Sequence, residues 1–132
     1  MTADLLHVGH LRTIRECQRH GEVIIGLLTE KALEGYKGTV IPYEERKELL
    51  EGFGVKVVPQ DSLNCFENLM ACKADYCASG DGFEPEELEA MRRANCKPLN
   101  IRLPGEGKGE KRHSSAEIKH ALCRSAWPPI HR

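Results

Sequence analysis

The tetrapeptide His7-Val8-Gly9-His10 carries the residue types most suited to chemistry, because two imidazoles stand three positions apart with a glycine between them. The residues behind it, 11–20, have the pattern of a helix that begins near the tetrapeptide, which would place His7 just before the helix and His10 in its first turn. The pattern rests on apolar residues at helical spacing and on a glycine that would end the helix: Leu11, Ile14, Cys17 and Gly21.

A helix N-terminus presents unpaired N–H groups and the positive end of the helix dipole, so it readily binds phosphate. Gly9 would let a bulky anion approach the backbone there. His7 and His10 could then donate hydrogen bonds to phosphoryl oxygens that gain charge in a transition state. A loop histidine followed by a surface histidine would produce the same four letters. A metal site is less well supported, since Asp4 is the one further ligand type close by.

The composition indicates one domain, because 132 residues can build one sizeable core and are too few for two. A net charge of −1 gives no sign of a nucleic-acid or membrane surface. No apolar run is long enough to span a membrane, and the N-terminus has no signal-peptide pattern. The six cysteines include no C-x-x-C pair, which predicts reduced core residues, no disulfides or zinc ligands, and a cytoplasmic protein.

Strand and helix patterns alternate along the chain, which predicts a three-layer α/β fold with a mostly parallel sheet. The run 22–28 is apolar throughout and predicts a strand buried on both faces. Further strands are expected over 55–58, 76–79 and 98–103. Helices are expected over 29–33, 42–50, 63–72, 85–94 and 114–124, the last opened by a Ser114–Glu117 capping box. Ligands bind at the carboxyl ends of such strands, where the following loops carry Lys37, Asp81 and residues 108–113.

Taken together, these stretches resemble the cytidylyltransferase-like nucleotidyltransferases. The resemblance covers residues 1–124 and leaves 125–132 as an irregular tail. It is carried, in order, by residues 3–10, Tyr36-Lys37, Pro42 to Lys47, Val57 to Gln60, Gly80-Asp81 and Ser114-Ser115. The segment from Tyr36 to Gln60 looks most similar to enzymes that activate 2-aminoethylphosphonate, phosphoethanolamine or glycerol 3-phosphate.

The resemblance implies transfer of CMP from CTP to such a phosphonate or phosphate ester, with release of pyrophosphate. It assigns catalytic roles, as contacts to the reacting phosphates or the acceptor, to His7, His10, Lys37 and Arg46. It assigns nucleotide binding to Thr2, Ala3, Gly9, Asp81, Arg112, Ser114 and Ser115. Mg²⁺ is expected to enter with CTP, held by phosphates and water and by no protein metal site. The resemblance also implies a Rossmann-like fold and a homodimer.

Each of these residues has an ordinary structural explanation when taken alone. Lys37 could be a solvated loop lysine, Asp81 a turn residue and Ser114 a helix cap. Arg46 could pair with a neighbouring glutamate on an exposed helix face.

The chain also departs from the family pattern. A central strand that precedes the position of Met1 in the family is absent here. Gly82-Phe83 stands where the family has Asp-Trp, and Arg112-His113 stands where it has Gly-Ile. These differences leave two alternatives open: an adenylyltransferase that uses ATP, and a non-catalytic module that binds nucleotides or a partner.

Overall fold

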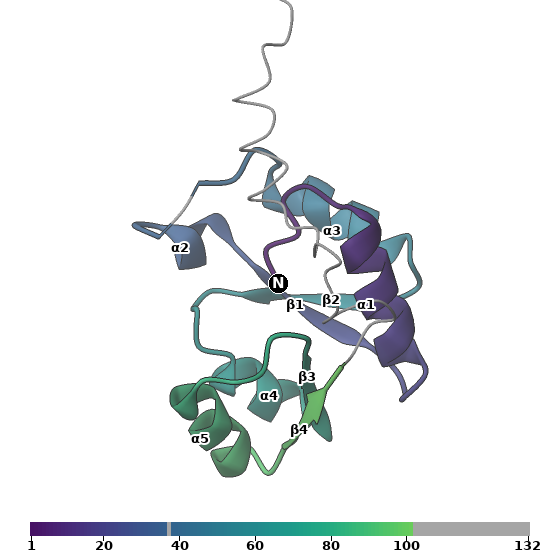
Figure 1. The fold of residues 1–132 in the computed structure, drawn as a ribbon. Helices are drawn as coiled ribbons and strands as arrows, with labels where there is room; N and C mark the ends of the chain where they lie inside the picture. Colours follow the sequence, from purple (N-terminus) through teal and green to yellow (C-terminus); the bar gives the residue numbers. More distant parts are fainter. Residues whose placement is uncertain (37, 102–132) are drawn as a thin grey trace, which may run out of the picture.

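The fold was analysed in a computed structural model that describes residues 1–36 and 38–101. These residues form a mixed α/β fold with parallel strands, as the alternating pattern predicts (Figure 1). The helices are α1 (Val8–Gln18), α2 (Glu30–Leu33), α3 (Tyr43–Glu51), α4 (Phe66–Cys72) and α5 (Pro85–Arg93). The strands are β1 (Ile24–Leu28), β2 (Lys56–Gln60), β3 (Tyr76–Ser79) and β4 (Lys97–Asn100).

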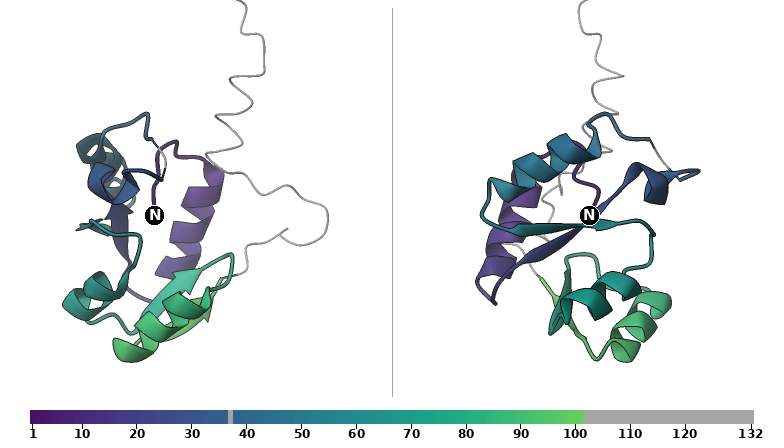
Figure 2. Two further views of the ribbon diagram at one scale, coloured as in Figure 1. Left: turned by 90° about the vertical axis from the view of Figure 1, so that its left-hand side faces the viewer. Right: turned by 180° about the vertical axis from the view of Figure 1, so that it is seen from behind.

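The four described strands form two parallel pairs. In the first pair β1 lies beside β2, in a register that runs from Ile24 opposite Lys56 to Leu28 opposite Gln60. In the second pair β3 lies beside β4, from Tyr76 opposite Lys97 to Ser79 opposite Asn100. Two views show the pairs as separate sheets, with α1 and α3 beside β1–β2 and with α4 and α5 beside β3–β4 (Figures 1 and 2).

The first sheet has its own core. Leu27 of β1 and Leu50 of α3 are fully buried, and Ile14 of α1 packs into the same cluster. Burial along β1 alternates, because Ile25 is 6% exposed whereas Ile24 is 38% exposed. The expectation that residues 22–28 form a strand buried on both faces is therefore wrong. With one neighbouring strand, β1 presents one face to a core and leaves residues on the other face exposed.

The second sheet has a separate core of buried residues from α4, from α5 and from the position just before β4. It consists of Leu69, Met91 and Cys96, and partly buried residues including Cys77 and Phe83 pack against it. Each half of the described chain thus buries its own apolar residues, and the α/β alternation is repeated in two small units.

Strand β2 runs to Gln60, two residues beyond the end expected at Val58. Pro59 was expected to stop it because proline has no N–H to donate to a sheet. The N–H of Lys56 donates to the carbonyl of Val23, and the carbonyl of Gln60 accepts the N–H of Thr29. The backbone N–H and C=O groups of even-numbered residues in β2 therefore point towards β1. The backbone polar groups of Pro59 point to the opposite side, away from β1. The missing N–H of this proline therefore removes no hydrogen bond between β2 and β1.

Met1 lies against the other edge of β1. Its amine donates to the carbonyl of Gly26 at 2.8 Å, and its carbonyl accepts the N–H of Leu28 at 2.9 Å. The backbone N–H and C=O groups of even-numbered residues in β1 point away from β2. Met1 pairs with two of these residues, so it extends the sheet by one residue at the edge opposite β2.

Candidate functional site

The two histidines form the start of α1. His7 is the residue that caps the helix, and its Nδ1 accepts the N–H of Gly9 at 3.0 Å. His10 reaches back, so that its Nδ1 accepts the N–H of His7 at 3.2 Å. This reciprocal capping box satisfies two N–H groups at the helix start. The sequence placed His7 just before the helix and His10 in its first turn, and both positions are confirmed.

The capping bonds also decide where each ring carries its proton. A nitrogen that accepts a hydrogen bond has no proton of its own, so neutral His7 and His10 carry theirs on Nε2. The two rings lie with their centroids 4.1 Å apart at an interplanar angle of 46°. The capping geometry therefore produces a pair of adjacent imidazoles whose remaining ring donors are both Nε2–H groups.

The surroundings of His10 keep its ring neutral. Burial, then the neighbouring His7 and then the N-terminal amine lower the pKa of His10 from its ordinary 6.5 to about 4. A neutral imidazole at pH 7 can still donate a hydrogen bond from Nε2, while its Nδ1 continues to cap the helix. His10 can thus contribute a fixed dipole to a phosphate without changing its protonation state.

This pKa predicts a specific pH dependence of stability. Between pH 6.5 and about 4 the unfolded chain binds a proton at His10 that the folded chain does not. Stability therefore rises with pH across this window and falls as the pH drops through it. Urea midpoints at pH 7.5 and 5.0 should show a smaller drop for His10→Asn than for the parent chain. An equal drop in the two proteins would contradict the assignment.

Asp4 anchors the segment ahead of the histidines. Its side chain is 1% exposed, and Oδ1 accepts the N–H groups of Val40 and Ile41 at 2.8 and 2.9 Å. These bonds join the stretch that leads into α1 to the loop between α2 and α3. From the sequence, Asp4 is a candidate metal ligand only. The sequence does contain a signal for the structural role of Asp4, because its carboxylate stands next to apolar residues on both sides.

Replacing Asp4 should therefore destabilise the fold. Asp4→Ala leaves the N–H groups of Val40 and Ile41 without their carboxylate, at a cost of about 2–3 kcal/mol. Urea denaturation measures this loss, and Asp61→Ala provides a matched control on a more exposed aspartate. A change below about 0.5 kcal/mol for Asp4→Ala would show that water replaces the carboxylate readily.

Arg46 lies inside the first half of the fold with no solvent exposure. Its Nη1 donates to the carbonyls of Thr2 and Leu28, both at 2.8 Å, and its Nε donates to Ile41 at 2.9 Å. Its Nη2 bonds to Glu30 at 3.0 Å. The interpretation of Arg46 as an exposed helix-face residue is thus wrong, because every guanidinium nitrogen has a partner within the protein.

These contacts give Arg46 a positioning role in the described structure. It ties the segment before the histidines to the end of β1 and to the start of α3. Glu30, which the sequence analysis did not single out, completes the arrangement by accepting from Arg46 and from the N–H of Tyr43. The family resemblance assigns Arg46 to the reacting groups, and that role stays a prediction.

Thr2 and Ala3 lie in this same anchored segment. The carbonyl of Thr2 accepts from Arg46, and Ala3 is 2% exposed with a φ of 49°. A left-handed conformation at a residue other than glycine costs about 1 kcal/mol. Gly9 lies in the first turn of α1, where its carbonyl accepts from the Thr13 hydroxyl. The structure thus places His7, Gly9 and His10 together at the start of α1, and it joins Arg46 to Thr2 in the segment ahead of that helix.

Asp81 follows β3 in a tight turn. The hydroxyl of Ser79 donates to the carbonyl of Gly82 at 2.9 Å and accepts the N–H of Asp81 at 3.1 Å. Gly82 has a φ of +83°, a conformation that favours glycine. The turn belongs to the second half of the fold. The other predicted site residues, Lys37, Arg112, Ser114 and Ser115, lie outside the described residues, as does the boundary expected at residue 124.

Comparison with known proteins decides the family. The model of the "Cytidylyltransferase-like" family matches residues 2–119. The chain belongs to the cytidylyltransferase-like family. The fold is thus that of a nucleotidyltransferase-type enzyme, as the motifs predict.

Two relatives of this cytidylyltransferase-like chain are named FAD synthase. The one from Archaeoglobus fulgidus is 29% identical over 111 residues, covering 77% of this chain and 80% of the relative. The one from Archaeoglobus profundus is 27% identical over 127 residues, covering 92% and 82%. The family assignment is confirmed, whereas the finer resemblance to phosphonate and glycerol 3-phosphate enzymes is not supported by these two relatives.

Two features of the described residues concern metal ions and membranes as partners of the cytidylyltransferase-like chain. Within 1–36 and 38–101, no three His, Cys, Asp or Glu side chains gather as ligands for a metal ion. In the same ranges no helix is long and apolar enough to cross a membrane.

Proposed function

We propose that this chain transfers AMP from ATP to the phosphate of FMN, forming FAD and pyrophosphate. The His7–His10 pair at the start of α1 is the observation that carries the nucleotidyl-transfer part of the proposal. The names of the two relatives support ATP and FMN as the substrates.

The reaction needs alignment and charge stabilisation more than it needs a protein nucleophile. A phosphate oxygen of FMN forms a bond to the α-phosphorus of ATP, while the bond from that phosphorus to the bridging oxygen of the β-phosphate breaks. Pyrophosphate leaves with the bonding electrons. Negative charge shifts onto the bridging oxygen and the non-bridging oxygens, where Nε2–H donors from His7 and His10 lower the barrier.

Mg²⁺ belongs to the proposal as a companion of the triphosphate. It commonly binds to proteins through substrate phosphates and water, with one or two carboxylates at most. When bound it would offset phosphate charge.

The turn after β3 supports ATP over CTP. The resemblance to cytidylyltransferases implies Asp-Trp at positions 82 and 83, where this chain has Gly-Phe. Gly82 adopts a φ of +83°, in which an aspartate would be strained. Phe83 packs against the second core and is thereby committed to packing. The two residues that the resemblance to cytidylyltransferases implies are therefore replaced here by residues with structural roles.

CMP transfer from CTP to a phosphonate or a small phosphate ester is the second candidate. It rests on the resemblance of residues 36–60 to enzymes that act on 2-aminoethylphosphonate or glycerol 3-phosphate. A smaller acceptor would still use the same chemistry at the α-phosphorus, so the histidine pair does not separate the two candidates.

Pyrophosphate release separates them directly. The full chain is incubated with Mg²⁺ and with ATP or CTP, each against FMN, 2-aminoethylphosphonate, phosphoethanolamine and glycerol 3-phosphate. We expect release with ATP and FMN, together with FAD detected by chromatography. Turnover with CTP and a small acceptor instead would favour the second candidate. Nucleotide binding without turnover for any pair would favour a non-catalytic module.

A further inference from the structure

Three cysteines from different parts of the second half meet in its core. Cys65 immediately precedes α4, Cys77 lies in β3 and Cys96 immediately precedes β4. Cys96 is 5% exposed, and the half-buried Cys65 and Cys77 pack against the cluster that contains it. The fold thus brings together thiols that are separated by eleven and eighteen residues of sequence.

Cys65 and Cys77 pack against the same cluster, and their pKa values are shifted in opposite directions. The hydrogen bond to Cys77 outweighs burial and lowers the pKa of Cys65 to about 7. The same hydrogen bond, followed by burial, raises the pKa of Cys77. At neutral pH the pair therefore contains one thiol with substantial thiolate character and one that keeps its proton. A thiolate is the nucleophilic form of cysteine, so Cys65 is the one suited to attack.

We propose that Cys65 and Cys77 are a redox-active pair that a hydroperoxide converts into a reversible intramolecular disulfide. The Cys65 thiolate attacks one oxygen of hydrogen peroxide, which breaks the O–O bond and gives a sulfenic acid and hydroxide. Cys77 then attacks that sulfur and releases the oxygen as water. Overall, two thiols and one peroxide give one disulfide and two waters, so two electrons pass from sulfur to oxygen.

The disulfide would join the start of α4 to the middle of β3. It would close a loop over the eleven residues between the two cysteines, which restricts the unfolded chain. We expect the oxidised protein to melt at least about 5 °C higher than the reduced protein, because the described half of the chain that holds the pair has a small core. β3 leads into the Ser79–Gly82 turn, so oxidation would also stiffen that turn.

Mass spectrometry of the full chain tests the proposal. The reduced protein is treated with one equivalent of hydrogen peroxide and digested without reduction. We expect a monomer lighter by two hydrogen atoms, a cross-link between the peptides that contain Cys65 and Cys77, and full reversal by dithiothreitol. The matched control is Cys72→Ser, which removes the half-buried cysteine at the end of α4 and should leave the cross-link intact.

Two further measurements distinguish the pair from an unspecific reaction. In the parent chain at pH 7, iodoacetamide should label Cys65 at least about 10-fold faster than Cys72, a comparison that needs no variant. Cys65→Ser and Cys77→Ser should each abolish the cross-link. A disulfide that instead uses Cys72 or Cys123, a disulfide between two chains, or equal labelling of Cys65 and Cys72 would overturn the proposal.

Discussion

His10→Asn is expected to lower kcat by about 100- to 1000-fold while leaving the melting temperature nearly unchanged. The Oδ1 of asparagine can take the place of Nδ1 and keep accepting the N–H of His7, so the capping box survives. Asparagine is too short to replace the Nε2–H donor. Loss of one preorganised donor to a developing phosphate charge costs about 10²–10³ in kcat. Initial rates of pyrophosphate release and thermal melts of the same samples check both parts.

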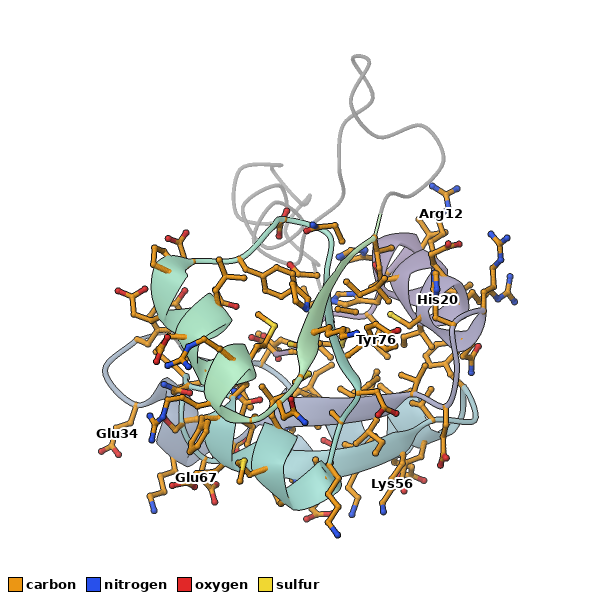
Figure 3. The ribbon with its side chains drawn as sticks, turned by 90° about the horizontal axis from the view of Figure 1, so that it is seen from below. Arg12, His20, Glu34, Lys56, Glu67 and Tyr76 are labelled. Carbon is orange, nitrogen blue, oxygen red and sulfur yellow. The ribbon has the colours of Figure 1, made fainter. Side chains whose placement is uncertain are left out.

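The chain offers a matched control on the same helix region. His20 follows α1 at its far end with 47% of its side chain exposed, and it lies on the outer surface together with Arg12 (Figure 3). His20→Asn should leave kcat within about twofold of the parent. If His10→Asn keeps most of the activity, the histidine pair serves only as a helix cap, and the proposed chemistry has lost its main support.

Arg46→Met is expected to cost about 3 kcal/mol or more of folding stability. The substitution keeps much of the side-chain volume but removes every donor to Thr2, Leu28 and Ile41. A buried carbonyl left unsatisfied costs about 1–3 kcal/mol, and small domains have only about 5–15 kcal/mol in total. Urea denaturation measures the change. The N-terminal segment should loosen with it, so activity should fall as well.

Arg92→Met is the control for this prediction, since Arg92 is 73% exposed and pairs with Glu89 on one helix surface. Such pairs contribute at most about 1 kcal/mol. The comparison also separates two roles of Arg46. If Arg46 clamps the substrate phosphate, Arg46→Met would raise KM with little loss of stability. That outcome would refute a purely internal role for Arg46.

Local patterns predicted many of the elements well. Strand β3 was placed at its observed bounds, and the helix over 85–94 ends one residue earlier than expected. The helix expected over 29–33 forms as α2, and Thr29 caps it because its hydroxyl accepts the N–H of Ala32. These features depend on turn residues, caps and periodicity within a few positions of the chain. The helix expected from residue 63 begins instead at Phe66, because Ser62 and Asn64 cap backbone N–H groups in a turn ahead of it.

The sequence by itself determined the α/β alternation, the position of the histidine pair at a helix start, and the resemblance on which the family assignment was first based. Each of these follows from neighbouring residues, whose spacing sets the local backbone and the motif. Tertiary structure alone decided that the described strands form two pairs with separate cores, that Arg46 is buried, and that Cys65 and Cys77 pack against one cluster. Burial and contact depend on residues far apart in sequence, so no local pattern records them.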